Sequence, residues 1–214
     1  MAPSLVSTLP GTCQPEWGVT VVRNDPQGLV DPLLGGLDEA ELVAASMEGR
    51  PGAFDLIVER HRRTVYRLCY RFVGNHEDAS DLAQDVFVRA FRGLRSFRRQ
   101  SSLGTWLYRI GVNVCLNHVN ARSPRTEPIE ERQHVDTRSQ SPADRMLRSE
   151  RAARVREAIA QLPRKQRATL ILRMYHELSH GQIASILGSS EGAVKANFFH
   201  ALGNLKKLLG DQDL

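Results

Sequence analysis

The strongest candidates for chemistry in this chain are three aspartates at helical spacing. Asp78, Asp81 and Asp85 stand at positions i, i+3 and i+7, so a helix would carry their carboxylates along one side. Carboxylates arranged in this way could hold a divalent metal ion for a nuclease reaction. The trio lacks the accompanying ligands and catalytic bases that such an enzyme needs. We therefore expect no catalytic residues, no enzyme activity and no cofactor.

The three cysteines offer little for metal or redox chemistry. Cys13, Cys69 and Cys115 are too few and too scattered for a disulfide framework or a paired CxxC zinc site. Cys115 and His118 form a lone C-x-x-H pair, and no second pair follows at ligand spacing. We expect no metal site and interpret the cysteines as small hydrophobic residues.

Two other groups of polar residues suit binding better than catalysis. Asp81, Gln84 and Asp85 at i, i+3 and i+4 share one helix face, which is either simply solvated or a docking surface for a basic or polar partner helix. Five arginines follow within eleven residues around Phe97, namely Arg89, Arg92, Arg95, Arg98 and Arg99. Basic residues interleaved with an aromatic ring suit single-stranded nucleic acid, whose backbone follows the charges and whose bases stack.

The segment "SHGQIASILGSSEGAVKANFFHALGNLKK" has the pattern of a helix-turn-helix. Ser179 and Gln182 predict a capping box, Gly188 predicts a left-handed helix end, and Ser189 or Ser190 caps the next helix. In that second helix a period of 3.6 places one stripe in the core: Val194, Phe198, Ala201, Leu205 and Leu208. The opposite face carries Lys195, Ala196, Phe199, His200, Lys206 and Lys207, as a DNA-contacting face would.

Helical periodicity without comparable β patterns predicts an all-α fold that positions these groups. We expect a disordered tail at 1–36, a compact helical domain at 37–121, a Pro-rich charged linker at 122–143, and a second helical domain with the helix-turn-helix at 144–210. As a coil the linker would average roughly 25 Å end to end, and it could stretch to about 70 Å.

The composition fits a globular protein with an anionic partner. The chain has 214 residues and a formal net charge of +5, a moderate excess that is compatible with nucleic acid. It has no apolar run of membrane-spanning length, and its first residues lack the pattern of a secretion signal. We expect a cytoplasmic location and no direct membrane insertion.

Two long segments together resemble one known family. "AFDLIVERHRRTVYRLCYRFVGN…EDASDLAQDVFVRAFRGLRSFR…TWLYRIGVNVCLN" resembles region 2 of an extracytoplasmic-function (ECF) sigma factor of the sigma-70 family. "LPRKQRATLILRMYHELSHGQIASILGSSEGAVKANFFHAL" resembles region 4 of the same family. The resemblance covers about residues 37–209, and the order of helical domain, linker and helix-turn-helix domain is the same.

The resemblance implies a factor that binds core RNA polymerase and directs promoter-specific initiation. It implies docking of Asp81, Gln84 and Asp85 on the clamp of the largest catalytic subunit. It also implies two sets of contacts with promoter DNA. The −10 set is Phe97, Arg98, Arg99, Gln100, Ser101, Asn113 and Asn117, with Phe97 in the loop that captures a flipped base. The −35 set is Ser179, Lys195, Ala196, Phe199 and His200. Family members are commonly held inactive by an anti-sigma factor, which is therefore an expected partner.

The sequence departs from the family at some positions, and one alternative function remains open. Family members often carry Arg or Ser where this chain has Ala196, Asn197 and His200, and the N-terminal tail is longer than usual. The alternative is a helix-turn-helix transcriptional regulator that does not act as a polymerase subunit. Such a regulator needs an upstream sensor or receiver domain, and residues 37–121 show no strand–helix alternation for one.

Overall fold

The computed structural model describes residues 32–121 and 142–210, and these residues form helices and no strands. The predicted all-α class is therefore confirmed for the described chain. Residues 1–31 of the predicted tail and 122–141 of the predicted linker lie outside the described residues. The elements are η1 Pro32–Gly36, α1 Glu39–Met47, α2 Ala53–Val73, α3 His76–Gly93, η2 Leu94–Ser96, α4 Leu103–Ala121, α5 Pro142–Ala160, α6 Arg164–Met174, α7 His180–Leu187 and α8 Glu191–Leu209.

The first group of helices, α1 to α4, begins and ends where local chemistry requires. Asp38 caps α1 in a capping box with Glu41, each side chain accepting a hydrogen bond from the other residue's backbone N–H. Gly74 ends α2 at a φ of 80°, a left-handed conformation that glycine adopts without steric cost. Asn75 then caps α3 by accepting from the N–H of Asp78.

The core of this first group lies between α2, α3 and α4. Leu68 and Phe72 of α2, Val86 of α3 and Leu107 of α4 are buried there. Gly111 lets α4 approach closely, since a Cβ on it would stand 2.7 Å from a terminal carbon of Leu68. Fully burying a side chain such as leucine stabilises a fold by about 1.5–3 kcal/mol, so this apolar layer holds the three helices together.

The second group, α5 to α8, contains the helix-turn-helix that the sequence predicts. The capping box of Ser179 and Gln182 starts α7, and Gly188 ends it at a φ of 59°. Ser190, rather than Ser189, caps α8 by accepting from the N–H of Ala193. Only three residues, 188–190, separate α7 from α8, as a helix-turn-helix requires.

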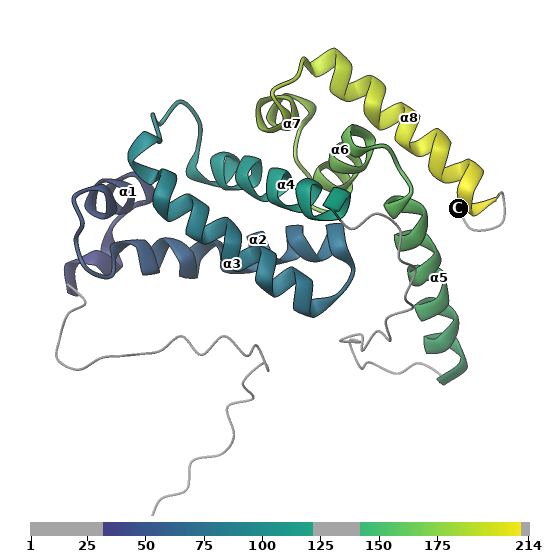
Figure 1. Ribbon diagram of the computed structural model, residues 1–214, viewed down its shortest axis with the longest axis horizontal. Coiled ribbons are helices and arrows are strands. Elements are labelled where there is room, and N and C mark those ends of the chain that lie inside the picture. Colours follow the sequence, from purple (N-terminus) through teal and green to yellow (C-terminus); the bar gives the residue numbers. More distant parts are fainter. Residues whose placement is uncertain (1–31, 122–141, 211–214) are drawn as a thin grey trace, which may run out of the picture.

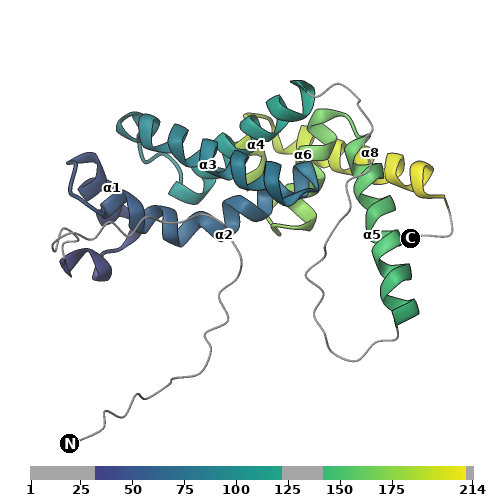
Figure 2. The same ribbon diagram turned by 60° about the horizontal axis from the view of Figure 1, so that its bottom comes forward.

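The two groups pack directly on each other. Helix α4 faces the second group, with α7 against it, and α6 lies against α2 (Figures 1 and 2). The guanidinium of Arg167 in α6 is buried and donates to the backbone carbonyl of Phe72 in α2. The helix-turn-helix therefore lies beside the first helical domain in this structure.

Three details differ from the sequence predictions. The predicted tail extends to residue 36, but Leu34 in η1 is fully buried, so ordered packing begins inside its last five residues. Leu208 is predicted to be in the core and is 45% exposed, because it lines an open hollow beside Arg154 and Glu157 of α5. Phe198 is only partly buried. Within the described residues, no helix combines the length and apolarity needed to cross a membrane.

Candidate partner and nucleic-acid interfaces

The predicted docking face lies on α3, and its three residues share one side of the helix. Asp81 and Gln84 are exposed, and the side chain of Asp85 is 40% exposed. Asp85 is paired with Arg89 of the next turn, with Nη2 of Arg89 2.9 Å from its carboxylate. This hydrogen bond with Asp85 raises the pKa of Arg89. The face thus combines a free carboxylate, an amide and an ion pair.

Two apolar residues extend this face and were missed in the sequence. Val88 is 46% exposed and Phe91 is 61% exposed, and both continue the series of Asp81, Gln84 and Asp85 at helical spacing. The ring of Phe91 is held at its edge by Phe54 of α2, with ring centroids 5.0 Å apart. Exposed apolar side chains grouped on one face can serve as a contact surface for a partner. Continuing the i+3 and i+4 steps beyond Asp85 would have found both residues.

The third aspartate of the trio does not belong to the α3 docking face. The carboxylate of Asp78 accepts a hydrogen bond from the side-chain amide of Asn75 at 2.7 Å and lies 3.7 Å from Nε2 of His118 in α4. Its side chain is 16% exposed. Asp78 therefore joins the start of α3 to α4. Within the part of the chain described, no three His, Cys, Asp or Glu side chains are grouped so as to hold a metal ion.

In the predicted base-capturing loop after α3, the polar residues are exposed and the aromatic residue is buried. Phe97 is 8% exposed and packs on Trp106, with ring centroids 5.1 Å apart. In this conformation of the loop its ring is not accessible to a base. Arg98, Gln100 and Ser101 are exposed. Arg99 has a φ of 55° and donates to the backbone carbonyl of Ala40 in α1 at 3.3 Å, so α1 holds the loop.

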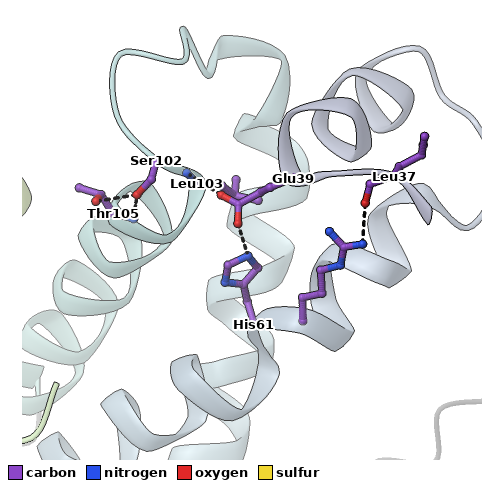
Figure 3. Close-up of polar contacts among 7 residues, drawn as sticks. Leu37, Glu39, His61, Ser102, Leu103 and Thr105 are labelled. Carbon is purple, nitrogen blue, oxygen red and sulfur yellow. Dashed lines mark hydrogen bonds and ion pairs between the residues drawn. The ribbon is translucent and has the colours of Figure 1, made fainter. Parts of the chain in front are cut away.

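A set of polar contacts fixes the start of α4, directly after this loop (Figure 3). The hydroxyl of Ser102 accepts a hydrogen bond from the N–H of Thr105 at 3.1 Å, as a helix cap does. Glu39 of α1 accepts from the N–H of Leu103 at 3.2 Å, and its other oxygen lies 3.4 Å from Nε2 of His61. The loop is thereby attached at both ends to well-packed helices.

Asn113 and Asn117, the remaining predicted −10 residues, are exposed one turn apart on α4. Arg109 precedes Asn113 by four residues, so the two share a face of the helix. The guanidinium of Arg109 lies close to Gly188, at the turn between α7 and α8, with Nη2 3.6 Å from where a Cβ would stand. The face of α4 that carries Asn113 thus adjoins the helix-turn-helix.

The predicted DNA-facing side of α8 is open to solvent. Phe199 is 74% exposed, with the ring of His200 beside it at a centroid distance of 6.0 Å. Ala196 and Ser179 are also exposed. Lys195 is exposed and pairs with Glu191 one turn earlier at 2.9 Å, which lowers the pKa of Glu191. Helix α8 therefore presents a cation, an aromatic ring and an imidazole to solvent.

The buried cysteines belong to the core. Cys69 of α2 and Cys115 of α4 are both fully buried and free. Their mutual hydrogen bond and their burial raise the pKa of the Cys115 thiol. The thiol therefore stays protonated and packs as a small apolar group.

Family models match both helical groups. Residues 57–125 match the model of sigma-70 region 2, and residues 152–205 match that of sigma-70 region 4. The first match contains α3, the loop after it and α4 as far as Ala121. The second contains the whole helix-turn-helix up to Leu205 of α8.

Curated proteins align with most of the chain. The RNA polymerase sigma-H factor of Pseudomonas aeruginosa is 36% identical over 180 residues, covering 80% of this chain and 93% of the relative. The ECF RNA polymerase sigma factor SigM of Mycobacterium tuberculosis is 37% identical over 173 residues, covering 80% of this chain and 85% of the relative. SigW of Bacillus subtilis, also an ECF sigma factor, is 31% identical over 173 residues, covering 77% and 92%.

Solved structures have the same fold. CnrH in complex with the cytosolic domain of CnrY aligns with a TM-score of 0.60 at 26% identity, covering 80% of this chain and 96% of CnrH. The sigma factor RpoE of Bartonella quintana, solved with the anti-sigma factor NepR, aligns with a TM-score of 0.55 at 20% identity, covering 75% and 99%. The second likeness shows a common fold.

Proposed function

This chain belongs to the ECF group of the sigma-70 family and is a sigma factor, and we propose that its α3 face binds core RNA polymerase. The proposed docking face consists of Asp81, Gln84 and Asp85, with Val88 and Phe91 as its apolar part. We propose that the protein acts by binding and positioning, without a catalytic step of its own. Its site of action would then be the cytoplasm, where polymerase and promoter DNA meet.

The docking proposal rests on one observation, which is that this single face of α3 combines exposed charged, polar, apolar and aromatic side chains. Interfaces combine exposed aromatic and apolar residues near their centre with polar residues around them. Phe91 is 61% exposed although Phe54 fixes its ring, so it can enter a partner without losing much side-chain freedom. Asp81 supplies an exposed carboxylate for a basic partner helix. The proposed partner surface is the clamp of the largest catalytic subunit.

We propose that the first helical domain, about residues 37–121, recognises the −10 element. Exposed Arg98, Gln100 and Ser101 would contact the single-stranded segment, and Asn113 and Asn117 would meet the adjoining DNA. Phe97 would have to leave its contact with Trp106 before its ring could receive a base, and Arg99 would have to release Ala40. Loop rearrangement on binding is common where a segment meets nucleic acid.

We propose that the second domain, about residues 144–210, recognises the −35 element through α8. Helix-turn-helix proteins place the N-terminal half of the second helix in the major groove. Lys195, Ala196, Phe199 and His200 lie in that half and are exposed. Lysine would contact phosphate, whereas the ring of Phe199 would contact a thymine methyl or sugar carbons. Ser179 would lie at the backbone from the start of α7.

We further propose an anti-sigma factor as a regulatory partner. Support comes from the likeness to CnrH, which is 26% identical and was solved in complex with a second protein, the cytosolic domain of CnrY. A partner that covers the α3 docking face or the α4 surface would keep the protein from polymerase or promoter DNA.

The docking proposal is tested by reversing charge on α3. We expect the double variant Asp81→Arg, Asp85→Arg to lose binding to core RNA polymerase by at least tenfold in a fluorescence titration, because two attractive contacts become repulsive. Its circular dichroism spectrum should match that of the unchanged protein, since neither carboxylate is buried. Phe91→Ala should also weaken binding and leave folding intact.

A matched control exists on the neighbouring helix. Asp55→Arg, Glu59→Arg changes two exposed acids at the same i, i+4 spacing on α2. It makes the same change in net charge and should leave the affinity for polymerase within about threefold, the scale of rim-charge effects. Equal losses for the two double variants would contradict a docking site on α3.

A further inference from the structure

An open hollow of about 240 Å³ lies where the end of α2 meets α5 and α6 (Figure 1). The turn from α2 to α3 forms one side of it, and α5 with the first turn of α6 forms the other. Arg156 of α5 reaches the turn, because a Cβ on Gly74 would stand 4.0 Å from Cδ of Arg156. The charged and polar part of the lining, with the turn glycine, is Arg71, Gly74, Asn75, Arg156, Glu157 and Arg167. Arginines from three helices therefore line one small space.

The lining carries an excess of positive charge. Three arginines stand against one glutamate, Glu157, which gives a net charge of +2. Among the described residues, neither Arg71 nor Arg167 forms an ion pair with a carboxylate. Burial lowers the pKa of Arg156, and the positive charge of Arg71 lowers it further. Cations held this close raise each other's free energy, and an anion between them would lower it.

Arg167 adds a hydrogen-bond donor that the fold leaves unused. The residue is 6% exposed, and its terminal nitrogens donate to the carbonyls of Phe72 and Ala160. Its Nε is buried and has no hydrogen-bond partner within the part of the chain that the structure describes. Native proteins leave few buried N–H groups unpaired, because each one costs free energy. Since Arg167 lines the hollow, an oxygen of an anion bound there would satisfy this donor.

The helix ends that meet at the hollow do not oppose an anion. The last carbonyls of a helix carry partial negative charge, but in α2 the carbonyl of Phe72 accepts from Arg167 and that of Tyr70 accepts from the N–H of Gly74. Helix α3 begins at His76, directly after the turn, and the start of a helix carries partial positive charge. The local backbone thus adds to the attraction of the three arginines.

The size and charge of the hollow indicate a phosphate group as the ligand. Guanidinium groups bind phosphate oxygens through pairs of parallel hydrogen bonds, and one phosphate has oxygens for several such donors. A phosphate group carries about −1.5 to −2 at pH 7, which nearly balances the net charge of +2, whereas a single carboxylate balances half of it. The hollow is smaller than the roughly 300–1,000 Å³ of pockets that enclose drug-sized ligands. It therefore suits a phosphate or a diphosphate, with any attached nucleoside outside it.

We propose that this hollow is a binding site for a phosphate group, which belongs either to free phosphate or diphosphate or to a nucleotide. The guanidinium groups of Arg71 and Arg156 would bind its oxygens, and Nε of Arg167 would donate to one of them. The site shares no residue with the α3 docking face or with the predicted −10 and −35 sets. It is therefore independent of whether the protein binds polymerase or promoter DNA.

Titration of the full chain with inorganic phosphate tests the site. The buffer contains about 0.15 M NaCl, which screens long-range attraction between exposed charges. Calorimetry should show saturable binding of one phosphate per chain, with a Kd below about 1 mM. Pyrophosphate and ADP are titrated in the same way to identify the source of the phosphate group. ADP that binds at least tenfold more tightly than pyrophosphate would indicate a nucleotide, and ADP that binds equally or more weakly would indicate free phosphate or diphosphate.

Variants of the lining should change phosphate affinity in opposite directions. Arg71→Gln and Arg156→Gln should each weaken it at least tenfold, because each removes charge-assisted hydrogen bonds. Arg156→Lys keeps the charge without the planar fork and should weaken it less, by about threefold. Glu157→Gln removes a repelling charge and should strengthen binding by about threefold. Arg167 stays unchanged because it also holds the carbonyl of Phe72. Circular dichroism checks that each variant is folded.

A matched control lies on the same two helices. Arg63 of α2 and Arg151 of α5 are exposed and do not line the hollow. The double variant Arg63→Gln, Arg151→Gln makes the same change in net charge as Arg71→Gln, Arg156→Gln. It should keep the phosphate affinity within about twofold, because exposed charges outside a site contribute little at this salt concentration.

Three results would overturn the proposal. They are no saturable phosphate binding below about 10 mM, equal losses of affinity in the two double variants, and weaker binding in Glu157→Gln. The measurement uses the free protein and contains neither polymerase nor DNA. A failure of the α3 docking proposal would therefore leave the phosphate result unchanged, and a failure of the phosphate site would leave the docking proposal standing.

Discussion

At the scale of single residues, Phe198 and Phe199 are adjacent in α8 but have different surroundings. Phe198 is partly buried beside the ring of His180, with centroids 6.0 Å apart. Phe199 is 74% exposed. Neighbours on a helix point about 100° apart, so one ring can face the domain while the other faces outward. This difference follows from the sequence, because Val194, Ala201 and Leu205 fix the buried side.

The two phenylalanines should therefore respond differently to truncation. Phe198→Ala should lower the free energy of unfolding by about 1–3 kcal/mol, less than the 3–5 kcal/mol of a fully buried ring. Phe199→Ala should change it by less than about 0.5 kcal/mol and weaken binding to a −35 duplex. Urea unfolding and a DNA titration of the same two proteins check this. A larger stability loss for Phe199→Ala would contradict the assigned DNA face.

Some residues could not be placed from the sequence. Periodicity around Phe97 does not reveal that Trp106, nine residues later and on another helix, covers its ring. Leu208 fits the core stripe of α8, yet it lines an open hollow beside α5 and is 45% exposed. In both cases the burial of the side chain depends on which residues of other helices lie beside it in the fold. The periodicity of the sequence does not contain that information.

At the scale of elements, cap and turn residues predicted the boundaries of the helix-turn-helix. Ser179 and Gly188 were recognisable because capping side chains and left-handed glycines are local requirements. The start of α4 was less predictable. It begins at Leu103, and part of its cap is Glu39 of α1, 64 residues earlier in the chain.

Gly111 sets how closely α2 and α4 pack. A Cβ there would stand 2.7 Å from Leu68, which is fully buried and cannot move freely. Gly111→Val should therefore lower the free energy of unfolding by at least about 2 kcal/mol, the scale of overpacking in a filled core. Gly203→Val in α8, where nothing lies within 4 Å of the new Cβ, is the matched control and should be nearly neutral. Similar urea midpoints for the two variants would contradict the close approach.

At the scale of the whole molecule, the sequence predicted two helical domains but not their contact. The donor Arg167 and the carbonyl of Phe72 are 95 residues apart. A hydrogen bond between residues so far apart in the chain produces no periodic pattern in the sequence. Arg167 alone is equally consistent with the solvated face of a helix.

The central claim, promoter-directed initiation through the α3 and α8 surfaces, is tested most directly by transcription from a promoter library. The full chain is mixed with core RNA polymerase, and the transcripts are sequenced. We predict specific initiation at templates that share two motifs at a fixed spacing. We predict its loss with Asp81→Arg, Asp85→Arg and an altered upstream motif with Phe199→Ala. Folded protein that gives no specific transcripts, or transcripts unchanged by both variants, would contradict the claim.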